Sequence, residues 1–248
     1  MRKAEGKQLI GIIYTSGSLE VAEMISQSGF DWVMIDMEHS VLTLKDVQNS
    51  LPVFGKKLLR IVRIPGNDPV WIKRVLDTGC DGIMVPMVNS GEEAEKLVRA
   101  AKYPPVGQRS VGITRAHSYG QSFSKYLESA NSDLIIMAQI EHRDGVRNID
   151  LILNIKGIDW IFIGPYDMSA SMGLAGQVSH PDVRKAIELV KKKCRDSGIP
   201  YGIFGASPEA LVQEFHDGCK YLLCGIDVFL ISTALRDLSG KLKALIKE

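Results

Sequence analysis

The stretch FDWVMIDMEH, residues 30–39, contains an unbroken apolar run that ends in acidic residues and a histidine. An apolar run without polar alternation is typical of a strand that is buried on both faces of a parallel sheet. Similar runs recur along the chain, and the full set is Leu9–Tyr14, Trp32–Asp36, Leu58–Arg63, Gly82–Pro86, Leu134–Glu141, Trp160–Gly164, Tyr201–Gly205 and Tyr221–Gly225. Eight such strands, each followed by a helix-like stretch, predict an α/β fold. We expect a closed (β/α)8 TIM barrel in preference to an open doubly wound sheet.

The stretches between the runs carry the signals of helices. Several end in glycine, as helices often do: 19–28 before Gly29, 182–196 before Gly198 and 208–217 before Gly218. The last expected helix, Asp227–Lys247, is long, and we predict that it packs on a neighbouring subunit. The segment 103–131 is an unusually long, polar connection between two runs. Such a segment is expected to be a functional loop or an interface.

The length of 248 residues suits one barrel domain that spans residues 1–248. The net charge of +1 gives no basic signature for nucleic acid and no polybasic tail for a membrane surface. No apolar run approaches the roughly 18 residues that a membrane-spanning helix needs. We therefore expect small-molecule partners and neither nucleic acid nor a membrane.

The beginning of the chain, MRKAEGK, is polar, and no apolar block of a signal peptide precedes the first run. The four cysteines, Cys80, Cys194, Cys219 and Cys224, form no CxxC pair and stand mostly in apolar surroundings. Reduced structural cysteines are the simplest interpretation. Both features predict a cytoplasmic protein.

The carboxyl ends of the strands are where a barrel of this kind places its active site. Chemically active residues follow several of the runs at this end. They are Asp36, Glu38 and His39 after the second run, Arg63 at the end of the third, Gln139 and Glu141 in the fifth, and Gly164, Pro165 and Asp167 in and after the sixth. Carboxylates, one histidine and one arginine are thus predicted to converge on one rim.

Glu141 and Asp167 stand at the ends of adjacent strands, with no cysteine or paired histidine nearby. Two carboxylates suit a hard divalent cation such as Mg²⁺ or Mn²⁺ and leave positions open for water and a chelating substrate. The alternative is that each carboxylate caps a helix or pairs with Arg143 or Arg147. Sequence spacing alone does not separate the two.

Arg63 and His39 have two interpretations each. The planar guanidinium of Arg63 offers a fork for a substrate carboxylate, or it forms a salt bridge to an acid of the rim. His39 stands close to Asp36 and Glu38, so its imidazole is a candidate general base near neutral pH. It can equally be a surface or structural histidine.

Three blocks of the chain are similar to the metal-dependent class II pyruvate aldolases of the HpcH/HpaI family, whose type activity is 4-hydroxy-2-oxoheptanedioate aldolase. The first is residues 30–39. The second covers residues 63–107, including Asn67-Asp68-Pro69, Asp77 and Val85-Pro86-Met87-Val88. The third joins residues 139–141 to residues 157–159 and 163–169. The resemblance extends over nearly the whole chain.

The resemblance implies a role for each matching residue. Glu141 and Asp167 would ligate the metal, Mg²⁺ or Mn²⁺ and possibly Co²⁺, with Gln139, Gly164 and Pro165 in the substrate pocket. Arg63 would stabilise the enolate oxygen or carboxylate of bound pyruvate. His39 would be the acid/base group, with Asp36 orienting it and Asp77 supporting the cluster. The family also implies a homo-oligomer, a trimer or a hexamer built from trimers.

The predicted function is therefore a metal-dependent aldolase that reversibly cleaves a 4-hydroxy-2-oxo acid to pyruvate, or a related 2-oxo acid, and an aldehyde. The same enolate site would also serve an oxaloacetate decarboxylase or a citrate-synthase-like enzyme that condenses the enolate with acyl-CoA. A non-catalytic metabolite-binding barrel is a further alternative. The chain departs from the usual family pattern at Met37, Ser40-Val41, Ile64 and Gly66, which leaves the acceptor aldehyde open.

Overall fold

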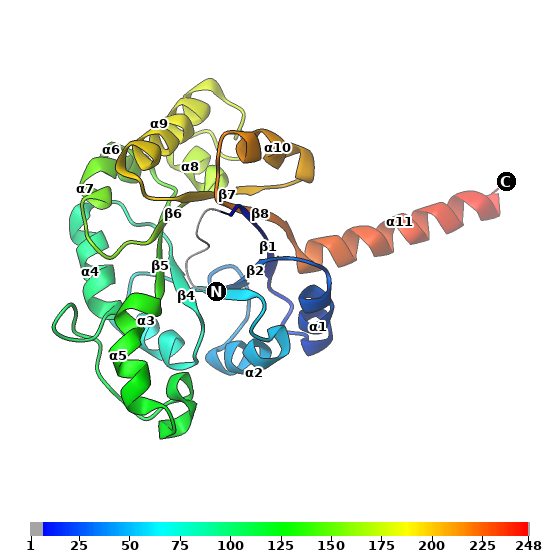
Figure 1. The fold of residues 1–248 in the computed structure, drawn as a ribbon. Coiled ribbons are helices and arrows are strands. Elements are labelled where there is room, and N and C mark those ends of the chain that lie inside the picture. The colour runs from blue at the N-terminus through cyan, green and yellow to red at the C-terminus, as the bar shows by residue number, and fades with distance from the viewer. Residues whose placement is uncertain (1–6, 248) are drawn as a thin grey trace.

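The computed structural model describes residues 7–247. Residues 1–6, which contribute to the expectation of a cytoplasmic protein, lie outside the described residues. Parallel strands form a closed barrel in sequence order, and β8 pairs with β1 (Figure 1). The strands are β1 (Leu9–Tyr14), β2 (Trp32–Asp36), β3 (Leu59–Arg63), β4 (Gly82–Val85), β5 (Ile135–Ile140), β6 (Trp160–Ile163), β7 (Tyr201–Gly205) and β8 (Tyr221–Ile226). The predicted barrel is confirmed, with strand ends shifted by a residue or less.

Helices follow the strands and, apart from the last one, cover the outside of the barrel (Figure 1). They are α1 (Leu19–Gln27), α2 (Leu44–Phe54), α3 (Pro69–Asp77), α4 (Gly91–Ala101), α5 (Phe123–Asp133), α6 (Arg143–Arg147), α7 (Ile149–Leu153), α8 (Pro165–Ser171), α9 (Pro181–Ser197), α10 (Pro208–His216) and α11 (Asp227–Lys247), with a 3₁₀ helix at Arg115–Gly120. Side chains cap several of the amino termini. The Ser18 and Ser90 hydroxyls accept backbone N–H groups of α1 and α4, and Thr43 forms a capping box with Asp46.

Two separate apolar cores follow from the alternation of side chains along each strand. Residues such as Val33 and Val62 point outward against the helices, and residues such as Met34 and Ile61 fill the barrel interior. A Cβ atom on Gly11 would lie 2.4 Å from the Trp32 indole, so glycine is required there for the ring to fit inside. The same alternation decides which residues face inward at the carboxyl ends of the strands.

The long connection between β4 and β5 contains the 3₁₀ helix and α5. Buried Arg109 anchors it, because its Nη2 lies 2.7 Å from Oδ1 of Asp77 in α3 and its guanidinium lies over the Tyr103 ring. His117 is also buried, and its ring contacts Phe123. This connection therefore packs as an ordered layer outside the barrel.

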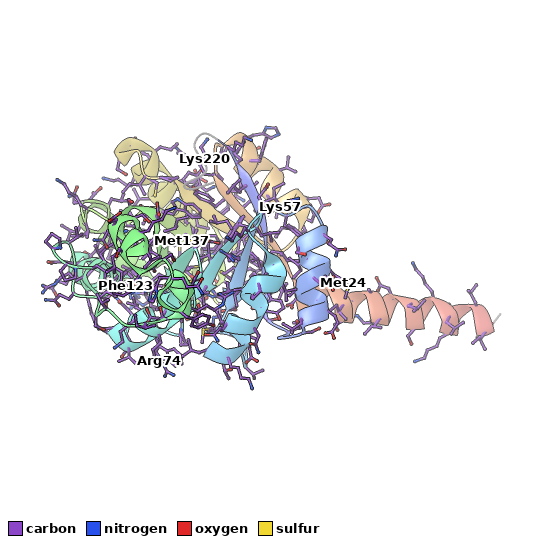
Figure 2. All side chains as sticks on the ribbon, turned by 60° about the horizontal axis from the view of Figure 1, so that its bottom comes forward. Met24, Lys57, Arg74, Phe123, Met137 and Lys220 are labelled. Atoms are coloured by element: carbon purple, nitrogen blue, oxygen red, sulfur yellow. The ribbon has the colours of Figure 1, made fainter. Side chains whose placement is uncertain are left out.

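Helix α11 projects away from the barrel in both views (Figures 1 and 2). Only its beginning is tied to the barrel, where the buried Asp227 carboxylate accepts the backbone N–H groups of Thr15 and Ser16. Large apolar side chains further along the helix, including Leu235 and Leu238, are more than half exposed. Within residues 7–247, no helix has the length and apolar character to cross a membrane.

Candidate active site at the carboxyl ends of the strands

Inward-facing polar residues collect at the carboxyl ends of β2, β3 and β5. Asp36 follows inward-facing Met34 by two residues, Arg63 follows Ile61, and Gln139 follows Met137. Each of the three is buried, and so is Glu141, the residue just after β5. The period of two along a strand thus places a polar layer directly above the apolar interior of the barrel.

Arg63 and Asp36 form a two-pronged ion pair. Nε of Arg63 donates to Oδ1 of Asp36 at 2.9 Å, and Nη2 donates to Oδ2 at 2.6 Å. Burial alone would lower the pKa of the Arg63 guanidinium, but the hydrogen bonds to Asp36 raise it above its ordinary value. The salt bridge to a rim acid, one of the two interpretations of Arg63, is therefore present. Among the hydrogen bonds of residues 7–247, Nη1 of Arg63 has no protein acceptor, so this edge of the fork faces outward from the pair.

Asp36 does not contact the imidazole of His39, contrary to the role that the resemblance implied. Its Oδ1 instead accepts the backbone N–H groups of Glu38 at 3.0 Å and His39 at 3.3 Å. The His39 side chain is 58% exposed, and the acid nearest to it is Glu38, 3.7 Å from Nε2. The Asp36 carboxylate therefore forms the ion pair with Arg63 and at the same time holds the backbone of the loop after β2 in place.

Within one chain Asp77 lies apart from the cluster, so the supporting role that the resemblance implies for it stays a prediction. It is the last residue of α3, which runs antiparallel to the strands, and it lies near the amino end of β4. Its carboxylate pairs with Arg109. The distance between Asp77 and its expected partners follows from the direction of α3, which returns the chain to the amino end of β4.

Glu141 is held from two sides. Its Oε1 accepts the backbone N–H of Met87 at 2.9 Å, and its Oε2 accepts a hydrogen bond from the amide of Gln139. Met87 has a left-handed backbone with φ of 54°, which is strained for a residue that is not glycine and aims this N–H at the carboxylate. Burial raises the pKa of Glu141 to about 7. The Met87 N–H opposes this shift, and the Glu38 and Asp167 carboxylates add to it.

Gly164 makes room for this arrangement. A Cβ atom there would lie 2.8 Å from Oε2 and 2.9 Å from Cβ of Glu141, and 3.1 Å from Nε2 of Gln139. Pro165 follows as the first residue of α8, where its fixed backbone suits a helix start, and Asp167 stands in the first turn. The sequence Gly164-Pro165-Tyr166-Asp167 thus brings a second carboxylate to the same rim without crowding the first.

The cluster carries an excess of negative charge. The carboxylates of Asp36, Glu38 and Glu141 interact with the Arg63 guanidinium, and Asp167 adds its negative charge to those of Glu38 and Glu141. Burial raises the pKa of Glu38 to about 7; Arg63 opposes the shift, whereas Asp36 and Asp167 add to it. Oε2 of Glu38 and Oε1 of Gln139 are buried and have no hydrogen-bond donor within the described part of the chain.

These residues fit a hard divalent cation. Oxygen atoms of carboxylates and amides are the ligands that Mg²⁺ and Mn²⁺ prefer, and Arg63 compensates only part of the negative charge of the four carboxylates. Between residues 7 and 247, no three acidic, histidine or cysteine side chains are arranged as a ready-made metal cage. A pair of protein ligands, Glu141 and Asp167, with the remaining positions left to water and substrate, is consistent with both observations.

The sequence placed Glu38 on this rim without giving it a role of its own, and it gave no role to Met87. Glu38 was within reach of the same reasoning, because it stands two residues after Asp36 and shares its side of the chain. The role of the Met87 backbone could not be predicted, because a left-handed conformation at a methionine has no signature in the sequence.

A barrel with buried carboxylates at the carboxyl ends of its strands defines a class of enzymes that bind small polar substrates there. The comparison with known proteins narrows this class. Residues 10–234 match the model of the HpcH/HpaI aldolase/citrate lyase family, and the chain belongs to this family.

Individual relatives agree with this assignment. The chain is 36% identical to a 4-hydroxy-2-oxo-heptane-1,7-dioate aldolase of Escherichia coli, over 96% of this chain and 92% of the relative. It is also 36% identical to a hydroxypyruvate/pyruvate aldolase of Pseudomonas aeruginosa, over 98% and 91%. An HpcH/HpaI aldolase/citrate lyase family protein from Burkholderia cenocepacia superposes with a TM-score of 0.93 at 30% identity, over 97% and 96% of the two chains.

Proposed function

We propose that this protein is a metal-dependent aldolase that cleaves a 4-hydroxy-2-oxo acid to pyruvate, or a related 2-oxo acid, and an aldehyde. The observation that carries the proposal is the cluster of four carboxylates near one arginine, of which Asp36 and Glu141 are buried, with the space that Gly164 leaves beside Glu141. The name of the E. coli relative supports a 4-hydroxy-2-oxo acid as the compound that is cleaved, and the name of the P. aeruginosa relative supports pyruvate and hydroxypyruvate as the 2-oxo acids.

In this proposal Glu141 and Asp167 hold a divalent cation, Mg²⁺ or Mn²⁺. When bound, such an ion acts as a Lewis acid toward the carboxylate and keto oxygens of a 2-oxo acid. Arg63, held rigid by Asp36, turns Nη1 toward the same oxygens and stabilises their developing charge. Gln139 fixes the Glu141 carboxylate, and Gly164 and Pro165 would line the substrate site beside it.

The test is release of pyruvate from a panel of 4-hydroxy-2-oxo acids with different groups on C4, followed with lactate dehydrogenase and NADH. We expect activity to disappear after treatment with EDTA and to return with added Mg²⁺ or Mn²⁺. Full activity in EDTA, or no release from any member of the panel, would contradict the proposal. Oxaloacetate and acetyl-CoA with a 2-oxo acid, assayed in parallel, distinguish the decarboxylase and condensing alternatives.

We also propose that a second copy of the chain covers helix α11. Leu235, Leu238, Leu242 and Leu245 follow a helical spacing and are 56–70% exposed on a helix that points away from its own barrel. The test is the mass in solution by light scattering. Replacing Leu238 and Leu242 with lysine should reduce an oligomer to a monomer, whereas Asp237→Lys, outside the leucine stripe, should not. A monomeric wild-type protein would refute the proposal.

A further inference from the structure

A cavity of about 430 Å³ lies on the outside of the barrel, between the neighbouring helices α3 and α4. Residues 108–110, at the start of the long connection between β4 and β5, form a third side of this cavity. Its volume suits a small metabolite, because ligand pockets measure about 300–1,000 Å³. None of the four carboxylates of the candidate active site lines it, so the cavity is a separate place on the molecule.

Unpaired cations line two sides of the cavity. Lys73 extends from α3, and Lys96 and Arg99 extend from α4. Within residues 7–247 none of these three side chains forms an ion pair. Glu92 and Glu95 also line the cavity, each four residues before one of the two cations of α4, which is the spacing at which exposed ion pairs form on a helix. Because these pairs do not form here, the cations remain available to a ligand.

Arg109 supplies a fourth cation, and it is the most buried residue that lines the cavity. Its Nη2 donates to Oδ1 of Asp77 at 2.7 Å, and its Nη1 donates to the Tyr126 hydroxyl at 3.3 Å. Nε of the same guanidinium is buried and has no acceptor in the described part of the chain. An incompletely paired cation is costly in a buried position, so an anion beside Arg109 would stabilise this side of the cavity.

The cations come from three different parts of the chain. A row of charges along one exposed helix face would bind solvent and salt, whereas α3, α4 and the long connection direct their cations to one enclosed volume. The cations outnumber the two glutamates of the lining, and the amide of Gln108 and the hydroxyl of Ser110 add neutral hydrogen-bonding groups. Charge, enclosure and polar groups together favour an anionic ligand.

We propose that this cavity binds a small molecule that has two or more anionic groups, either phosphates or carboxylates. Cations on separate helices match a ligand with separate charges, because a single charge would leave most of them unpaired. A ligand held in this way links α3 to α4 and is not itself converted. The inference does not depend on the proposed aldolase function, because no residue of the carboxylate cluster takes part in the binding.

The experiment is isothermal titration calorimetry of the full-length protein with fructose 1,6-bisphosphate and with tricarballylate, which represent the phosphate and carboxylate forms of the ligand. Fructose, without the phosphates, is the uncharged control. We expect saturable binding of at least one of the two anions and no binding of fructose. In Lys96→Gln/Arg99→Gln, which changes two exposed side chains, the affinity should fall by about tenfold or more. In Lys56→Gln/Lys57→Gln, which removes the same charge from exposed lysines outside the cavity, it should stay within about twofold.

Three results would overturn the inference. The first is the absence of saturable binding for both anions. The second is an equal loss of affinity in the two double variants, because binding would then reflect only the overall charge. The third is loss of binding when Mn²⁺ and oxalate are present to occupy the candidate active site, because the anion would then bind there. If only one of the two anions binds, its identity decides between phosphate and carboxylate as the group that the cavity recognises.

Discussion

Replacing Gly164 with alanine tests the geometry around Glu141 with a single methyl group. Gly164 has φ of −101°, so alanine meets no conformational penalty, and the effect of the change is steric. The new Cβ would lie 2.8 Å from Oε2 of Glu141, and ordinary contact begins at 3.4 Å, so this oxygen must move by about 0.6 Å. Metal–ligand distances tolerate deviations of about 0.2 Å. The displacement is thus about three times the tolerance.

Glu141 cannot simply swing aside. Its own Cβ would be 2.9 Å from the new methyl group, and this atom is fixed to the end of β5. We therefore expect Gly164→Ala to weaken Mn²⁺ binding by about 10- to 100-fold, as changes beside a metal ligand do, and to lower stability by about 1–3 kcal/mol through overpacking. Mn²⁺ binding by electron paramagnetic resonance and unfolding in urea measure the two effects.

The matched control is Gly91→Ala at the start of α4, where the nearest atom to a new Cβ is 3.4 Å away. This variant should bind Mn²⁺ as the wild type does. Unchanged Mn²⁺ affinity and unchanged activity in Gly164→Ala would refute this reasoning, because the backbone at Gly164 would then not confine the Glu141 side chain.

Further predictions concern charge, backbone and metal. Arg63→Lys should lower kcat by about 100-fold or more, since an ammonium group cannot pair with Asp36 through two parallel bonds and also face the substrate; steady-state kinetics decide this. Asp77→Asn should lower the free energy of unfolding by about 2–3 kcal/mol, because it removes the partner of a buried guanidinium; a loss below 0.5 kcal/mol in urea would disagree. Met87→Gly, which keeps the N–H and relieves the left-handed backbone, should leave Mn²⁺ affinity within about threefold. Mn²⁺ at 100 times its Kd should stabilise the wild type by about 2.7 kcal/mol but not Asp167→Asn, as thermal unfolding would show.

The fold could be predicted because buried parallel strands have a recognisable sequence pattern. Runs such as residues 32–36 are apolar throughout, since both of their faces are buried, and the glycine and proline residues between them mark the helix ends. The same pattern predicted which polar residues converge, because the carboxyl ends of parallel strands meet at one rim. These residues are Asp36, Arg63, Gln139 and Glu141.

The contacts within the site were less predictable. Residues adjacent in sequence were expected to pair, but Asp36 uses its carboxylate for Arg63, 27 positions away, and contacts His39 only through the backbone. A bidentate guanidinium pair is stronger than a bond to a solvated imidazole, and three-dimensional proximity decides which forms. Asp77 shows the same limit, because its distance from the rim depends on the direction of α3.

We propose that Glu141 and Asp167 hold one catalytic cation between β5 and the start of α8. Titration of Mn²⁺ into the protein, followed by electron paramagnetic resonance, tests it most directly when the wild type is compared with Glu141→Gln and Asp167→Asn. We predict one bound ion for each wild-type chain, and loss of that ion in either variant while the circular dichroism spectrum stays unchanged. Retention of one tightly bound ion in both variants would contradict the claim.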